Sequence, residues 1–226
     1  MMRIDVISAV PEILYSPLNH SIIKRARVRG KVEIHLHNLR DYADNKHLQI
    51  DDKPYGGGAG MILKPEPFFR CIDKLKSERT YDKLIVTSAR GKLFGQSDAN
   101  RLSLAQNLIF IAGHYKGIDE RVIERFADEE FSVGNFVLTG GELPVLIFID
   151  SIVRLIPGVL NDSESALSDS FQAGENIGEP YYTKPEVIDG MKVPDVLLRG
   201  DHRAIAEWKE EESHKSTDIW KRNNNT

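Results

Sequence analysis

Short apolar runs that alternate with helix-like segments constrain the fold of this 226-residue chain more than any other feature. Residues 84–87 and 108–112 are continuously apolar, which is typical of strands that are covered on both faces. A helix-like segment follows each run, at 97–105 and 119–126. This alternation predicts an α/β fold with a parallel sheet and helices on both faces.

Further elements are expected on either side of these runs. Residues 3–8 are short and β-branched, and residues 32–36 alternate apolar with polar side chains, so both are predicted strands. Residues 131–138 are another strand candidate. Further helices are predicted at 19–28, 68–77, 142–156 and 203–212.

The composition changes after Pro157 and Gly158. Residues 161–170 are rich in Ser, Asp and Glu, as in a mobile linker. We therefore predict a large domain at 1–160, a flexible linker at 161–173 and a small, mainly α-helical domain at 174–226. The polar residues 221–226 are predicted to fray.

Composition indicates a cytoplasmic protein that does not cross a membrane. The net charge of −4 argues against a general polyanion binder, although local basic patches remain compatible with it. The single cysteine, Cys71, fits a reducing compartment and is interpreted as a buried structural thiol. The N-terminus is typical of a strand and not of a signal peptide. The longest apolar stretch, 145–149, ends at Asp150 and is too short to span a bilayer.

Three glycine-bearing loops follow predicted strands, at 88–91, 113–117 and 138–144. The adjacent Gly140 and Gly141 let the backbone approach a ligand closely, because no Cβ intervenes. Thr139 and Glu142 have the spacing of a capping box, which predicts that a helix begins here. We expect the three loops to form one composite ligand pocket.

Other motifs leave two interpretations open. The glycine cluster 51–61 lacks the ending of a P-loop and follows no strand, so it is either a surface loop or a loop that closes over a flat substrate. Arg154, in a mostly apolar helix, needs a partner, which an internal salt bridge to Asp150 would supply. Asp169, judged by its spacing alone, is a solvated linker carboxylate.

Histidines and basic residues form two further groups. His35 and His37 share one face of a strand, but no third ligand stands nearby, so they are interpreted as surface histidines. A dense basic segment is either a solvated helix face or a surface for nucleic-acid phosphates. Its members are Lys24, Arg25, Arg27, Arg29 and Lys31, and Arg199, His202 and Arg203 form a second candidate patch.

Eight motifs in one order, within a region from Arg3 to about Trp208, resemble the bacterial tRNA (guanine-N1)-methyltransferases of the knotted SPOUT superfamily. They are DDKPYGGG (51–58), GHY (113–115), GIDER (117–121), SVGNFVL (132–138), GGELP (140–144), IPGVL (156–160), DSF (169–171) and YTKPEV (182–187). The resemblance implies a deep trefoil knot in the parallel sheet, whereas periodicity alone predicts only an open sheet. It also implies a homodimer with shared active sites.

The resemblance implies a site for S-adenosylmethionine on the glycine loops. The implied cofactor positions are Ser88, Gly113, Val133, Gly134, Asn135, Phe136, Val137, Leu138, Gly140, Gly141 and Pro144. The implied substrate positions are Tyr55, Gly57, Gly58, Tyr115, Lys116 and Ser165. No residue is assigned to a metal.

The implied reaction is methylation of N1 of the guanosine immediately 3′ of the tRNA anticodon, which supports reading-frame maintenance. N1 carries a proton, which Asp169 from the partner's linker would remove as general base. Negative charge then builds on O6, where Arg154 would stabilise it. The small domain would grip the anticodon arm, and the target base would leave its stack.

The chain departs from the family pattern at three places. Lys116 stands where many relatives carry Glu, His114 where many carry Arg, and 175–180 does not align with a linker-side Asp. The family's carboxylates are associated with magnesium dependence, so a role for Mg²⁺ is left open, and we hypothesise that Lys116 supplies positive charge near the guanine.

The alternatives are a knotted methyltransferase for another RNA and a non-catalytic RNA-binding relative; Arg154 and Asp169 together favour an enzyme.

Overall fold

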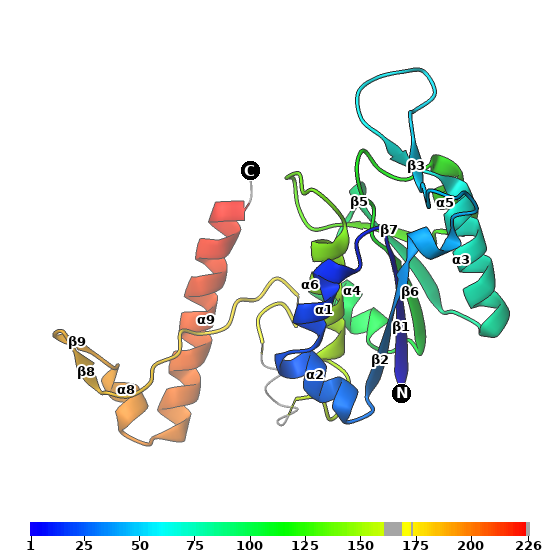
Figure 1. The fold of residues 1–226 in the computed structure, drawn as a ribbon. Helices are drawn as coiled ribbons and strands as arrows, with labels where there is room; N and C mark the ends of the chain where they lie inside the picture. Colours follow the sequence, from blue (N-terminus) through cyan, green and yellow to red (C-terminus); the bar gives the residue numbers. More distant parts are fainter. Residues whose placement is uncertain (161–168, 173, 225–226) are drawn as a thin grey trace. The chain divides into compact units, whose positions relative to one another are not determined.

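The computed structural model describes residues 1–160, 169–172 and 174–224, in two compact units, Met1–Asn161 and Asp162–Thr226. The first unit contains a five-stranded sheet in the order β2-β1-β6-β5-β7, and all its strand pairs are parallel (Figure 1). This confirms the predicted parallel α/β architecture. The strands are β1 Met2–Ser8, β2 Val32–Asn38, β5 Lys83–Leu93, β6 Asn107–Ile111 and β7 Glu129–Ser132.

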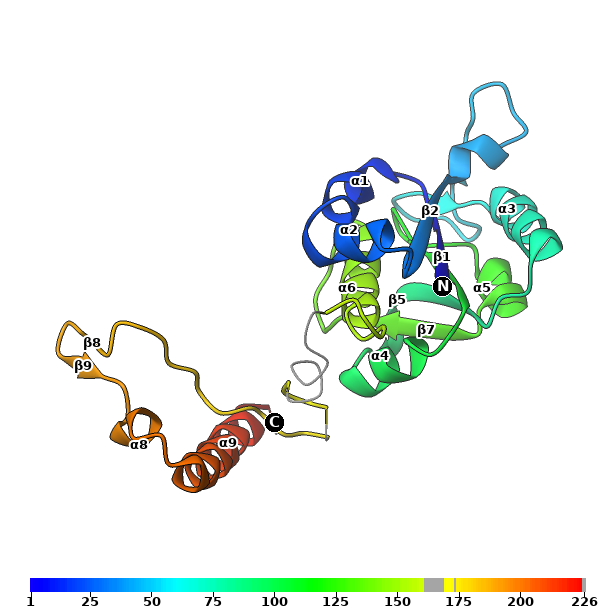
Figure 2. The same cartoon turned by 90° about the horizontal axis from the view of Figure 1, so that it is seen from below.

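Helices cover both faces of this sheet (Figure 2). One layer contains α1 Glu12–Leu18, α2 Ser21–Val28, α4 Gln96–Leu102 and α6 Glu142–Val153. The other contains the short 3-10 helix η1 Leu39–Tyr42, α3 Pro65–Glu78 and α5 Glu120–Phe126. Helix α6 is apolar on most of its surface, and its Phe148 ring lies 4.4 Å from the ring of Phe94, measured between centroids. The buried apolar side chains of α6, such as Phe148 and Ile149, anchor the helix to the sheet.

A buried carboxylate, Asp5, organises the middle of the sheet. Its Oδ2 accepts hydrogen bonds from Arg3 Nε at 2.7 Å and Tyr81 Oη at 2.8 Å, and His37 Nε2 lies 2.7 Å from Oδ1. Burial alone would raise the pKa of Asp5, but the hydrogen bonds from His37, Arg3 and Tyr81 outweigh it and hold the pKa well below its usual range. His37 is thus part of this network, and its interpretation as a surface histidine is wrong.

Cys71 is buried within α3, as predicted. Burial raises the pKa of its thiol to about 12, so the reactive thiolate is disfavoured.

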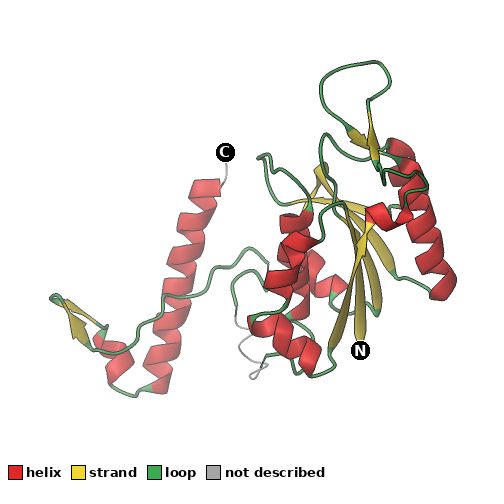
Figure 3. Cartoon of the chain, in the orientation of Figure 1, coloured by secondary structure: helices red, strands yellow, loops and turns green. Residues whose placement is uncertain are grey.

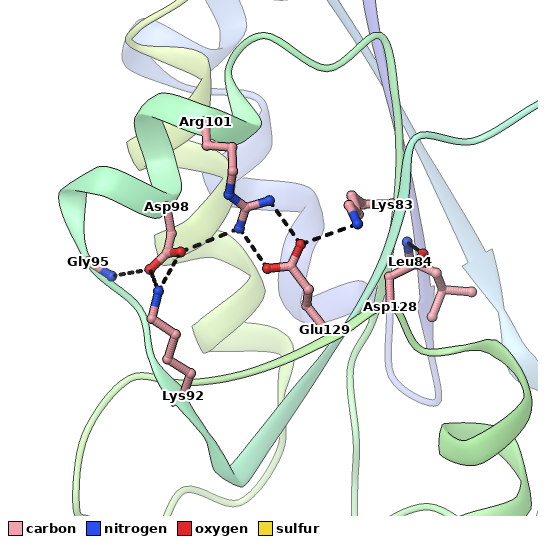
Figure 4. Close-up of polar contacts among 8 residues, drawn as sticks. All are labelled: Lys83, Leu84, Lys92, Gly95, Asp98, Arg101, Asp128 and Glu129. Carbon is pink, nitrogen blue, oxygen red and sulfur yellow. Dashed lines mark hydrogen bonds and ion pairs between the residues drawn. The ribbon is translucent and has the colours of Figure 1, made fainter.

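Alternating charges join α4 to β5 and β7 (Figure 4). Glu129 pairs with Arg101 at 2.6 Å and with Lys83 at 3.8 Å, and Asp98 pairs with Lys92 at 2.9 Å and with Arg101 at 3.4 Å. Burial alone would raise the pKa of Asp98, but hydrogen bonds from Lys92 and a backbone amide lower it. The network therefore fixes α4 against β5 and β7.

Several predicted boundaries are wrong. Strand β7 ends at Ser132, because Gly134 has a φ of +148° and its backbone turns back onto the Ser132 hydroxyl. Residues 88–91 lie within β5 as an irregularity between Thr87 and Lys92, and do not form a loop after a strand. Helix α6 has Gly141 as its N-cap without a side-chain cap, so Thr139 does not form the predicted capping box. The same helix ends at Val153, before residue 156.

The first unit also contains a small hairpin of β3 Asp51–Asp52 and β4 Ile62–Leu63, whose loop projects from the body of the unit (Figure 1). The second unit contains the hairpin β8 Val187–Ile188 and β9 Met191–Lys192, and the helices α8 Asp195–Leu198 and α9 His202–Asn224 (Figure 3). Because α9 continues to Asn224, the fraying predicted from residue 221 is wrong for residues 221–224. Most of the predicted linker, with Ser165, lies outside the described residues.

Within the described ranges, none of the helices combines the length and the apolar character needed to cross a membrane.

Candidate active site

The three glycine-bearing segments meet in one cavity of about 450 Å³. Residues 86–90 of β5, 113–118 after β6 and 133–141 before α6, apart from Asn135, supply most of its wall. In open α/β sheets, ligands bind at the carboxyl ends of the strands, and this cavity follows that rule. The predicted composite pocket is therefore present.

The cavity gathers most of the residues singled out in the sequence. All the implied cofactor positions line it except Asn135, and so do Tyr115 and Lys116. Their binding of S-adenosylmethionine and guanine stays a prediction. Tyr55, Gly57 and Gly58 lie instead on the β3–β4 loop, where Tyr55 is fully exposed.

The base of that loop contacts the cavity rim through Lys116. The Lys116 backbone N–H donates to the Met61 carbonyl at 3.0 Å, and a Cβ on Gly60 would lie 2.9 Å from Lys116 Cγ. This contact connects the exposed glycine loop to a residue that lines the cavity.

Gly141 explains why the sequence needs adjacent glycines here. Its N–H donates to the Gly113 carbonyl at 2.6 Å, and a Cβ at this position would lie 2.7 Å from Gly113 N and would overlap Thr87 Oγ1. Real Cβ atoms do not approach backbone that closely, so a larger residue would push the loops apart. The close approach of three separate segments depends on the missing side chain.

A buried acidic residue lies behind the cavity wall. Glu142 begins α6 with its side chain 2% exposed, and Ser8 Oγ donates to its Oε1 at 2.7 Å. Its other oxygen, Oε2, lies 3.6 Å from Nδ1 of His114, which lines the cavity. Sequence reasoning used Glu142 only as a capping residue and missed Ser8. The available signal was a carboxylate placed directly after two glycines at the start of an apolar helix.

The described part of the cavity does not fit a divalent cation. Its two lining carboxylates, Glu120 and Glu130, both accept hydrogen bonds from Arg90, at 2.6 and 3.2 Å. Lys116 adds another positive charge to the wall, and no three potential metal-ligating residues cluster anywhere within the described ranges. Mg²⁺ in proteins is usually held by one or two carboxylates together with waters, and both carboxylates of this wall are already engaged by Arg90.

Arg154, one of the two candidate catalytic residues, does not line this cavity. Arg154 is the half-buried C-cap of α6, and its backbone N–H donates to the Asp150 carbonyl at 3.2 Å. Because Gly141, the N-cap of α6, lines the cavity, a helical rise of 1.5 Å per residue puts the backbone of Arg154 roughly 20 Å away. Asp169 is half-buried and belongs to the second unit. The cavity wall that the first unit supplies therefore does not include Arg154.

A parallel sheet with a glycine-walled cavity at its carboxyl edge defines a class of α/β proteins that bind small cofactors there. Within this class the chain belongs to one family, since the family model described as "tRNA (Guanine-1)-methyltransferase TrmD" matches residues 2–224. Membership confirms the resemblance of the motifs and makes the chain an enzyme, a methyltransferase.

Curated relatives agree over almost the whole chain. The tRNA (guanine-N(1)-)-methyltransferase of Chlorobaculum tepidum is 51% identical, over 96% of this chain and 94% of its own length. That of Bacteroides thetaiotaomicron is 51% identical, over 96% of both chains. That of Chlorobium chlorochromatii is 52% identical, over 92% of this chain and 90% of its own length.

Proposed function

We propose that this enzyme transfers a methyl group from S-adenosylmethionine to N1 of the guanosine immediately 3′ of the tRNA anticodon. Family membership over residues 2–224, together with one cavity that gathers almost all the implied cofactor positions, carries this proposal. A volume of about 450 Å³ suits a nucleoside-sized ligand. The closely packed Thr87, Gly113 and Gly141 support a trefoil knot at this place.

The proposal includes a homodimer in which each active site is shared. Arg154 is too far along α6 to serve the cavity of its own chain, so it would complete the cavity of a second copy. An exposed apolar face on α1 and α6 supports this association, with Ile13 42%, Leu143 50% and Ile147 50% exposed. Such a face is self-complementary across a two-fold axis.

The chemistry needs a base, a charge stabiliser and alignment. When bound, S-adenosylmethionine supplies an electrophilic methyl group on its sulfonium. Asp169 of one copy takes the proton from guanine N1, and Arg154 of that copy stabilises the negative charge on O6. The cavity loops of the other copy hold the methyl group in line with N1. The N1–C bond forms as the S–C bond breaks, leaving S-adenosylhomocysteine and N1-methylguanosine.

The second unit would bind the anticodon arm. Its aromatic residues Tyr181 and Tyr182 are 75% and 50% exposed, and Lys184 follows them closely in the sequence. Aromatic faces stack on unpaired bases and basic side chains contact phosphates, which suits an RNA loop.

Methyl transfer from labelled S-adenosylmethionine would test the proposal, with two tRNAs that differ only in guanosine or adenosine 3′ of the anticodon. We expect transfer to the guanosine tRNA only. Transfer to neither, with S-adenosylmethionine binding intact, would contradict the proposal and favour another RNA substrate or a non-catalytic RNA binder.

A further inference from the structure

We infer that the basic segment around α2 is a docking surface for the phosphate backbone of the tRNA. The segment carries five Lys and Arg residues between positions 24 and 31, and residues 20–31 contain no acidic residue, although the whole chain has a net charge of −4. Lys24 and Arg25 are exposed on α2, whose buried residues are Ile23 and Ala26. The local excess of positive charge therefore faces solvent.

Few of these charges are cancelled by neighbouring acids. Among the described residues, Lys24, Arg25 and Lys31 have no ion pair. Arg27 donates to the Leu18 carbonyl at 3.1 Å and to Asn19 Oδ1 at 2.8 Å. Both acceptors are neutral, so they fix the side chain without removing its charge. A surface of fixed and uncancelled positive charge is what a polyphosphate backbone binds.

A hollow of about 340 Å³ adjoins this surface, between α1, α2 and the edge strand β2. Tyr15, Asn19, Arg27, His35 and His37 contribute polar groups to its wall. Tyr15 is 52% exposed, and it lines the same hollow as Arg27. This combination suits a ribose and its phosphate better than an apolar ligand.

The place of the surface in the unit connects it to the reaction. Arg29 Nη1 donates to the carbonyls of Gly158 and Val159, both at 3.4 Å, so the end of α2 is attached to the segment that follows Arg154. The basic surface and Arg154 therefore lie at the same end of α6, away from the cavity of their own chain. This step rests on the proposed function: where Arg154 completes a partner's cavity, the α2 surface lies beside the tRNA that delivers the guanosine.

The salt dependence of tRNA binding tests the inference, with Lys24→Gln/Arg25→Gln in the full-length protein. Removing one phosphate contact reduces the slope of log K against log salt by about 0.7 to 0.9. Between 50 and 200 mM salt, the wild type should thus lose roughly tenfold more affinity for tRNA than the double variant, which lacks two contacts. The affinity for S-adenosylmethionine should stay the same.

The matched control is Lys74→Gln/Lys76→Gln on α3, which removes the same charge from exposed positions on the opposite face of the sheet. We expect the control to keep the wild-type slope. An α2 variant with the wild-type slope, or a control whose slope falls as much, would overturn the inference. So would wild-type binding to anionic phospholipid vesicles that the α2 substitutions abolish while tRNA binding is unchanged. Wild-type protein that methylates no tRNA would instead contradict the proposed function.

Discussion

Helix α6 has different surroundings at its two ends. Its first residue, Glu142, is buried behind a cavity walled by loops whose glycines allow close backbone contact. Its last turn leads to Arg154 and to a segment bonded to the basic residues around α2. One end is thus shaped for a small cofactor and the other carries charge suited to RNA. A rigid helix of this length separates the cavity from Arg154 within one chain, which is why the proposed active site combines two copies.

Asp169→Ala is the strongest test of the proposed chemistry. Loss of a general base should lower kcat by roughly 10² to 10⁴-fold, because the guanine N1 proton would have no acceptor. The affinity for S-adenosylmethionine should not change, since Asp169 belongs to the second unit and the residues of the cavity to the first. Single-turnover kinetics and calorimetry measure the two quantities. A variant that loses cofactor binding in parallel with kcat would contradict the separation of roles.

Asp5→Asn tests the sheet that supports both ends of α6. Removing one partner from a buried ionic network should destabilise the fold by about 3 kcal/mol at neutral pH. The pKa of Asp5 is lower in the folded protein, so its contribution is present above about pH 4, the value of the unfolded chain, and is lost as the pH falls below it. Urea unfolding should therefore show the wild-type advantage at pH 7 and a smaller one at pH 3. An equal difference at both pH values would refute this account.

Gly141→Ala breaks only the cavity end. The new Cβ would overlap Thr87 Oγ1 and lie 2.7 Å from Gly113 N, so the loops must separate. We expect S-adenosylmethionine affinity to fall at least about tenfold, which corresponds to roughly 1.4 kcal/mol of lost binding free energy. The affinity for tRNA should be preserved. Gly95→Ala is a matched control, because a Cβ there meets open space. Unchanged cofactor affinity in Gly141→Ala would show that the three loops do not form the cofactor site.

Removal of divalent cations should have the smallest effect. Lys116 and the Arg90-bound carboxylates leave the described cavity wall without a fitting site, so EDTA should change methyl transfer by less than about twofold. The substrate for this assay is an anticodon stem-loop kept folded by spermidine, so that chelation does not unfold the RNA. Complete loss of activity in EDTA, restored by Mg²⁺, would contradict the role given to Lys116.

Local patterns predicted the scaffold better than the site. Continuous apolar runs located β5 and β6, because a strand buried on both faces has few alternatives in sequence. The end of β7 was missed, since the turn at Gly134 depends on its φ of +148° and on contacts with Ser132. The capping box predicted from Thr139 and Glu142 is likewise absent, because the Glu142 side chain is buried against Ser8 and His114.

Long-range contacts explain what sequence reasoning could not reach. His37 and Asp5 are far apart in the chain, and only the pairing of β1 with β2 brings them within 2.7 Å. The separation of Arg154 from the cavity likewise requires knowing where α6 begins and ends. The order of the motifs identified the family, but the separation of the two ends of α6 could be known only from the structure.

Mixed dimers test the shared active site most directly. Copies with Arg154→Ala and copies with Gly141→Ala, each with its own affinity tag, are combined and the heterodimer is purified. In a shared site, the intact cavity of the first copy meets Arg154 of the second, so we predict about half the wild-type methyl transfer per dimer. Both homodimeric variants should be nearly inactive at an S-adenosylmethionine concentration that leaves the Gly141→Ala cavity largely empty. An inactive heterodimer that still binds S-adenosylmethionine and tRNA would contradict the account, because it would place the complete site within a single chain.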